Sequence, residues 1–76
     1  MNSKINNVLD VSSFGLNLYW LMEEKGYTRE GLAKEIGVTP RMIYSYLSNQ
    51  KWPTVATLVA IANVLDVSLD DILRKA

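Results

Sequence analysis

The sequence predicts an all-α fold of five short helices, and three observations lead to this prediction. A chain of 76 residues is long enough for one small domain with a single core. Apolar residues recur at intervals of three and four, which is the period of an α-helix. Threonine, serine and glycine stand at the ends of these periodic segments, where helix caps are expected. We therefore expect residues 13–76 to form a compact domain, and residues 1–12 to form an N-terminal arm or a short extra element.

The first helix is expected to begin after a cap at Ser12 or Ser13 and to end at Gly26. Its apolar stripe consists of Phe14, Leu18, Leu21 and Met22.

Residues 28–47 predict two further helices joined by a tight turn. Thr28 is placed to cap a helix at about 28–36, and Gly37 ends it, because glycine reaches the left-handed conformation without strain. Thr39 and Pro40 are an N-cap and an N1 proline, which begin the next helix at about 39–48. The small residues Ala33 and Gly37 suit a close crossing of the two helices. An unrelated αα-hairpin is the alternative, but the agreement of several position types favours a helix-turn-helix.

The rest of the chain predicts two more helices. One begins near Thr54 and the other after a Ser68 cap, with Asp70 and Asp71 suiting the positive end of its dipole. Their apolar positions are Leu58, Ile61, Ala62 and Leu65 in the first and Leu69, Ile72 and Leu73 in the second.

Three segments stand in a fixed order along the chain: LAKEIGVTPRMI from Leu32 to Ile43, then Pro53, then LVAIANVLDV from Leu58 to Val67. They match the pattern LAxxxGVSxxxI, xxP and LxxIAxxLxV. Residues 14–73, about four-fifths of the chain, therefore resemble the lambda-repressor and Cro-like helix-turn-helix family, also called the XRE family. The resemblance implies a five-helix lambda-repressor-like fold that binds double-stranded DNA, with helix 39–48 in the major groove.

The composition argues against several other classes of protein. The chain contains neither cysteine nor histidine, so the usual metal ligands and the commonest general base are missing. We therefore predict no enzyme, no catalytic residue, no metal and no cofactor. Apolar runs are shorter than the ~20 residues that cross a bilayer, and the N-terminus lacks the apolar core of a signal peptide. We expect a cytoplasmic protein that does not engage a membrane.

The charge distribution bears on DNA binding more than the charge itself. The formal net charge is zero, which is unusual for a protein that neutralises phosphates. Between Lys25 and Lys51, however, five basic residues stand against two acidic ones, and the acids collect in the flanks. Ordinary fluctuation of charge along a sequence is the alternative explanation.

The outward positions of helix 39–48 are the candidates for reading bases. Arg41 is the first choice, because a guanidinium pairs with both major-groove acceptors of guanine; a phosphate contact or a solvated side chain is the alternative. Tyr44 could contact a thymine methyl group, a base or a phosphate, or simply cover the surface. Thr39, Pro40 and Ser45 are the remaining candidates.

Phosphate contacts are expected from the flanks of the reading helix. Arg29 stands at the start of helix 28–36, where the N-terminus attracts anions. Asn49 and Lys51 match positions that resemble phosphate contacts of the family, and Asn49 also tolerates the left-handed conformation expected there. Tyr27, Lys34 and Trp52 are weaker candidates, for which packing or solvation is the alternative.

A second surface is predicted on the back of the first helix. Leu16 and Trp20, with Tyr19 beside them, face away from its apolar stripe. Either the N-terminal Ile5, Val8 and Leu9 fold over this face, or it is a protein interface. Trp52 was grouped with these residues as a further interface candidate.

These observations predict a sequence-specific DNA-binding transcriptional regulator, a repressor of the phage or bacterial type that occupies an operator as a homodimer. A regulatory protein partner is compatible with the second surface. The alternative is that the fold serves as a protein-interaction module, as in an antitoxin-like partner or an anti-repressor.

Overall fold

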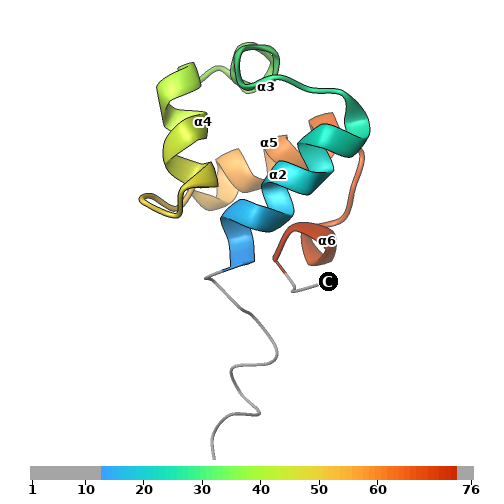
Figure 1. Ribbon diagram of the computed structural model, residues 1–76. Helices are drawn as coiled ribbons and strands as arrows, with labels where there is room; N and C mark the ends of the chain where they lie inside the picture. The colour runs from blue at the N-terminus through green and yellow to red at the C-terminus, as the bar shows by residue number, and fades with distance from the viewer. Residues whose placement is uncertain (1–12, 74–76) are drawn as a thin grey trace, which may run out of the picture.

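The computed structural model describes residues 13–73, which form five helices (Figure 1). They are α2 (Phe14–Lys25), α3 (Arg29–Ile36), α4 (Pro40–Leu47), α5 (Val55–Leu65) and α6 (Leu69–Leu73). The all-α prediction is confirmed, and each predicted helix is present within about two residues of its expected bounds. The arm predicted for residues 1–12 lies outside the described residues.

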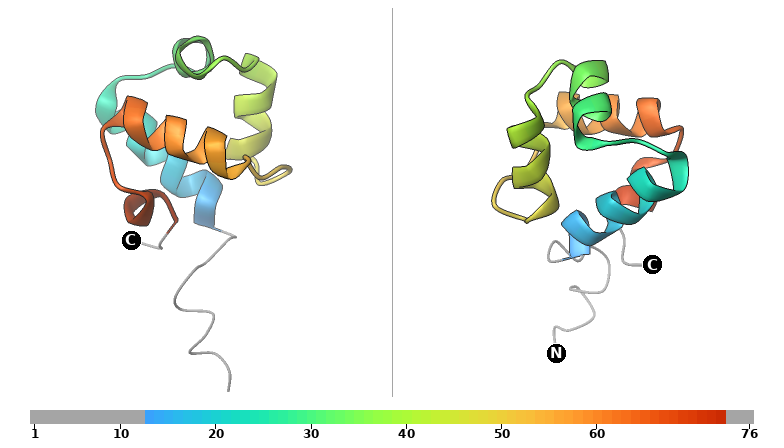
Figure 2. Two further views of the ribbon diagram at one scale, coloured as in Figure 1. Left: turned by 180° about the vertical axis from the view of Figure 1, so that it is seen from behind. Right: turned by 45° about the horizontal axis from the view of Figure 1, so that its top comes forward.

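The helices pack around one core. Helix α2 contacts α4, α5 and α6, while α3 contacts α4 and α5. Two further views show α3 and α4 together at one end of the domain, and α6 against the other (Figure 2). Every helix buries at least one large apolar side chain completely; these are Phe14, Leu18, Leu32, Ile43, Ile61, Leu65 and Ile72. Apolar residues from all five helices meet in this cluster, which holds α4 in place. Leu69, an apolar position predicted for the last helix, is exposed instead.

The N-caps predicted at Thr28, Thr39 and Ser68 are confirmed, and Thr54 caps α5 in the same way. The hydroxyls of Thr28, Thr39 and Thr54 each accept a hydrogen bond from the backbone N–H three residues further on, at 2.9–3.2 Å. Before α6, the Ser68 hydroxyl accepts from the Asp71 N–H, and an Asp71 carboxylate oxygen accepts from the Ser68 N–H, both at 3.1 Å. This reciprocal pair is a capping box.

The cap expected for the first helix is different. Ser13 precedes α2, but its side chain makes no capping hydrogen bond. Instead, Oδ1 of Asn49 accepts from the backbone N–H of Gly15 at 3.0 Å, across 34 residues of sequence. A Cβ atom added at Gly15 would overlap the carbonyl oxygen of Leu47. The start of α2 is therefore in direct contact with the end of α4.

The expectation that Gly37 makes room for a close crossing of α3 and α4 is also corrected. A Cβ atom added at Gly37 would meet nothing within 4 Å, so this glycine is not required for space. Its φ of 78° is the reason for it, because other residues adopt that conformation only with strain. The position that does need a glycine for space is Gly15.

Among residues 13–73, no helix is long and apolar enough to cross a bilayer.

Candidate nucleic-acid interface

Helix α4 has one buried side and one outward side. Ile43 and Tyr46 are buried in the core, and burial raises the pKa of the Tyr46 hydroxyl from its ordinary value. Pro40, Arg41 and Tyr44 are exposed on the outward side. The side of α4 that packs is thus separate from the side available to a partner.

Five of the predicted site residues line a single open hollow of about 420 Å³. They are Arg29, Pro40, Arg41, Tyr44 and Ser45. Glu30 and Gln50 line it as well, and neither was among the sequence candidates. Gln50 lies in the link after α4, and its amide can donate to and accept from a base or a phosphate. The position of Gln50 between Asn49 and Lys51, both predicted phosphate contacts, is the sequence signal that indicates it as a site residue.

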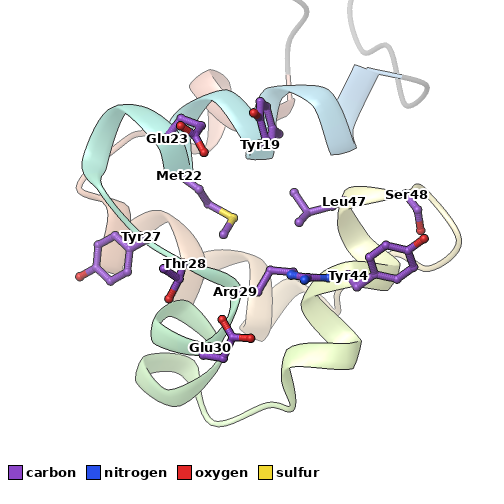
Figure 3. Close-up of a pocket in the computed structure, with 10 residues that line it drawn as sticks. All are labelled: Tyr19, Met22, Glu23, Tyr27, Thr28, Arg29, Glu30, Tyr44, Leu47 and Ser48. Atoms are coloured by element: carbon purple, nitrogen blue, oxygen red, sulfur yellow. The ribbon is translucent and has the colours of Figure 1, made fainter.

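Arg29 and Tyr44 are in contact, although the sequence assigned them different tasks. The guanidinium carbon of Arg29 lies 5.7 Å from the centroid of the Tyr44 ring, which is within the range of a cation–π interaction. Figure 3 shows the Arg29 side chain leaving α3 and extending toward Tyr44 on α4. The contact links the first residue of one helix to the outward side of the next.

The same two residues also border a groove of about 430 Å³ between α2, α3 and α4 (Figure 3). Tyr19 and Met22 line it from α2, while Tyr27 lines it from the α2–α3 turn. Tyr19 therefore belongs partly to this groove, as well as to the back of α2. Arg29, Glu30 and Tyr44 line both the groove and the hollow beside α4, so the two are parts of one surface.

The remaining predicted site residues lie outside the hollow. Lys51 is exposed in the link. Thr39 is exposed, but its hydroxyl caps α4. Asn49 has the expected left-handed backbone, with φ of 62°, and its side chain caps α2. The sequence did not reveal this structural role, because the partner lies 34 residues away; the predicted phosphate contact of Asn49 stays a prediction.

Leu16 and Trp20 are exposed on the back of α2, with 56% and 60% of their surface accessible. Tyr19 and Trp20 meet edge to face, with ring centroids 5.1 Å apart. Ile5, Val8 and Leu9, which were predicted as a possible cover, lie outside the described residues.

Trp52 stacks on Phe14, the first residue of α2, with ring centroids 4.7 Å apart. Phe14 faces the core, while 46% of the surface of Trp52 stays accessible. Trp52 thus also has a packing role, and its part in a protein interface stays a prediction.

A second exposed apolar pair was not predicted. Val55 and Val59 lie four residues apart on α5, with 77% and 39% of their surface accessible. Both valines fall outside the apolar positions predicted for this helix, which are those of its core side.

The arrangement defines a helix-turn-helix domain with a polar, basic outward side on its second helix. A model of the helix-turn-helix family matches residues 18–72, which is more than half of the chain. The chain belongs to this family, and specifically to its XRE type, whose members are DNA-binding regulators.

Individual relatives agree with this assignment. The chain is 34% identical over 61 residues to the uncharacterized HTH-type transcriptional regulator YqaE of Bacillus subtilis, a match that covers 80% of this chain and 53% of YqaE. The chain thus spans about half the length of that relative. The N-terminal DNA-binding domain of SinR from Bacillus subtilis is 29% identical, with a TM-score of 0.76 over 84% of this chain and 94% of the domain. SinR in complex with DNA is 32% identical, with a TM-score of 0.69 over 74% of this chain and 90% of the other.

More distant structures share the fold alone. The restriction-modification controller protein C.AhdI from Aeromonas hydrophila is 23% identical, with a TM-score of 0.78 over 84% of this chain and 97% of the other. The chain also resembles 35% of hydroxypropylphosphonic acid epoxidase from S. wedmorenis, at 22% identity and a TM-score of 0.74 over 88% of this chain. The fold is therefore not restricted to regulators, and function has to be argued from the site.

Proposed function

We propose that the protein is a sequence-specific transcriptional repressor of the phage or bacterial type, which occupies its operator as a homodimer. The observation that carries the proposal is the clustering of Arg29, Pro40, Arg41, Tyr44 and Ser45 around one exposed hollow beside α4. Base-reading and phosphate-binding candidates from two helices thereby form one surface. Repression would follow from occupancy of the DNA, without a cofactor and in the cytoplasm.

In this proposal α4 enters the major groove, with its N-terminal residues against the base edges. Arg41 pairs with a guanine, while Thr39, Pro40 and Ser45 make short-range contacts with neighbouring bases. Arg29, Lys51 and Asn49 contact phosphates and set the orientation of the domain on the duplex. Tyr44 lines the same hollow as Arg29 and Arg41.

A dimer is proposed because one helix of this length reads only a few base pairs. Two copies of α4 placed one turn of DNA apart, roughly 34 Å, would read a palindrome with greater affinity and specificity. Activity would then depend on protein concentration, on dimerisation, or on a regulatory protein partner.

Selection of binding sites from random DNA at physiological salt tests the proposal. Enrichment of a palindrome is expected. On the selected site, Arg41→Ala should lose about 1–3 kcal/mol of binding free energy, and preference should relax at one base position in each half-site. Lys51→Ala is the control: it should weaken binding to all sequences alike and reduce the salt dependence. An unchanged preference in Arg41→Ala would remove Arg41 from the role of base reader.

A second candidate function is a protein-interaction module, favoured by the exposure of Leu16 and Trp20. This function predicts no enriched DNA sequence, together with a protein partner whose binding is lost when Leu16 and Trp20 are both changed to serine. A double variant that leaves partner binding intact would contradict it.

A further inference from the structure

We propose that Tyr44 is a positioning residue for Arg29, whose guanidinium its ring holds against the reading helix. The phosphate contact and the base-reading helix would then engage DNA as one preformed unit. This inference rests on the proposed function, and assigns Tyr44 a part in it that differs from base reading.

The contact between Arg29 and Tyr44 joins α3 and α4, which are consecutive helices linked by the turn at Gly37. Arg29 is the first residue of α3, and Tyr44 lies in the middle of α4. The 5.7 Å from guanidinium carbon to ring centroid is a distance at which the ring quadrupole attracts a cation. Both side chains border the groove shown in Figure 3 and the hollow beside α4.

An exposed arginine has several freely rotating bonds, and ordering them on binding lowers affinity. A guanidinium already resting on a ring loses less freedom when it meets a phosphate. Arg41 and Glu30 line the same hollow as Arg29, so charges of both signs border it. The negative face of the Tyr44 ring attracts the guanidinium of Arg29 toward the outward side of α4.

The expected consequence is that the Tyr44 ring matters equally for all DNA sequences. Phosphate contacts carry no direct sequence information, so a residue that acts through Arg29 should affect overall affinity. A residue that reads a base should affect preference. The two roles of Tyr44 are therefore distinguishable by comparing a selected operator with a scrambled duplex.

The first measurement is made on the free full-length protein by NMR. The ring current of Tyr44 should shift the Hδ resonances of Arg29 upfield from their usual position. Tyr44→Phe retains the ring and should keep this shift, whereas Tyr44→Leu should abolish it. Tyr44 is about half exposed, so neither change should prevent folding, which the backbone amide spectrum checks. If the Hδ resonances of Arg29 had the same chemical shifts in Tyr44→Leu and in the wild type, the proposed contact would be absent in solution.

The second measurement is a double-mutant cycle of Kd values on the selected operator and on the scrambled duplex. Tyr44→Leu should weaken binding to both duplexes by roughly two- to five-fold, as expected for a contact of this kind. Tyr44→Phe should recover the affinity lost in Tyr44→Leu. In an Arg29→Met background, Tyr44→Leu should cause no further loss.

Three results would overturn the positioning role. These are a loss confined to the operator, failure of Tyr44→Phe to recover affinity, or an equal loss in the Arg29→Met background. If the wild type bound neither duplex, the proposed function would fail and the positioning role with it. The NMR shift would still report the contact in that case, so a failed contact and a failed function give different results.

Discussion

The turn before α4 and the link after it both fix the position of one end of α4, but by different means. Before α4, the left-handed Gly37 ends α3 and the Thr39 hydroxyl caps α4, so both contributions are local in sequence. After α4, the left-handed residue is Asn49, and its side chain caps α2 at Gly15. The N-terminal end of α4 is thus placed by local geometry, and its C-terminal end by a tertiary contact.

This difference matters for the orientation of α4. A local turn sets how α4 leaves α3, but it cannot set where the far end of α4 lies relative to the first helix. The contact of Gly15 with Leu47 and Asn49 does so. A substitution in the contact between Gly15 and the end of α4 should therefore disturb α4 and α2 together.

The largest effect is expected for Gly15→Ala. The added methyl group would overlap the carbonyl oxygen of Leu47, so α2 and α4 would have to move apart. We expect a loss of about 3 kcal/mol in the free energy of unfolding, measured by urea denaturation. Gly31→Ala is the matched control, because its Cβ would meet only two side-chain atoms, the Thr28 hydroxyl at 3.2 Å and a Tyr27 ring carbon at 3.8 Å. Equal effects of the two changes would show that the α2–α4 contact is not tight.

An intermediate effect is expected for Asn49→Ala. It removes the acceptor for the Gly15 N–H and places a Cβ-bearing residue without a polar side chain at φ of 62°. The two losses together should lower the free energy of unfolding by about 2 kcal/mol.

Asn49→Gly separates these two contributions. Glycine relieves the backbone strain but leaves the Gly15 N–H without its acceptor, so about half of the loss should remain. Wild-type stability in Asn49→Gly would mean that the capping hydrogen bond is unimportant.

The smallest effect is expected for Gly37→Ala, at about 1 kcal/mol. Space is available for the methyl group, so only the cost of the left-handed conformation remains. Thermal unfolding followed by circular dichroism would measure it. If Gly37→Ala lowered the free energy of unfolding as much as Gly15→Ala, the distinction between the local turn before α4 and the tertiary contact after it would be contradicted.

The features that could be predicted from the sequence are those that depend on residues close to one another along the chain. The helices, the threonine caps and most of the apolar positions follow from spacing and side-chain type, and the structure confirms them. Leu69 is the exception, because this apolar position of α6 is exposed. The cap of α2 was predicted wrongly, because its acceptor comes from a residue far along the chain. Gly15 was overlooked for the same reason: the atom that excludes a side chain there belongs to Leu47.

The site divides in a similar way. The outward residues of α4 were predicted from helical periodicity, and the structure gathers most of them around one hollow. The pairing of Arg29 with Tyr44 depends on how α3 and α4 cross, which spacing within either helix does not reveal. The stacking of Trp52 on Phe14 was not predicted, because the two residues lie far apart along the chain.

The contact between Arg29 and Tyr44 also limits how this domain could be re-engineered. Exchanging only the exposed side chains of α4 for those of another regulator would leave Arg29 facing a residue with which it was never paired. A transplant of binding preference into this scaffold should therefore include position 29, although that position lies on a different helix. Libraries that vary residues 29 and 44 together should yield functional variants more often than libraries that vary α4 alone.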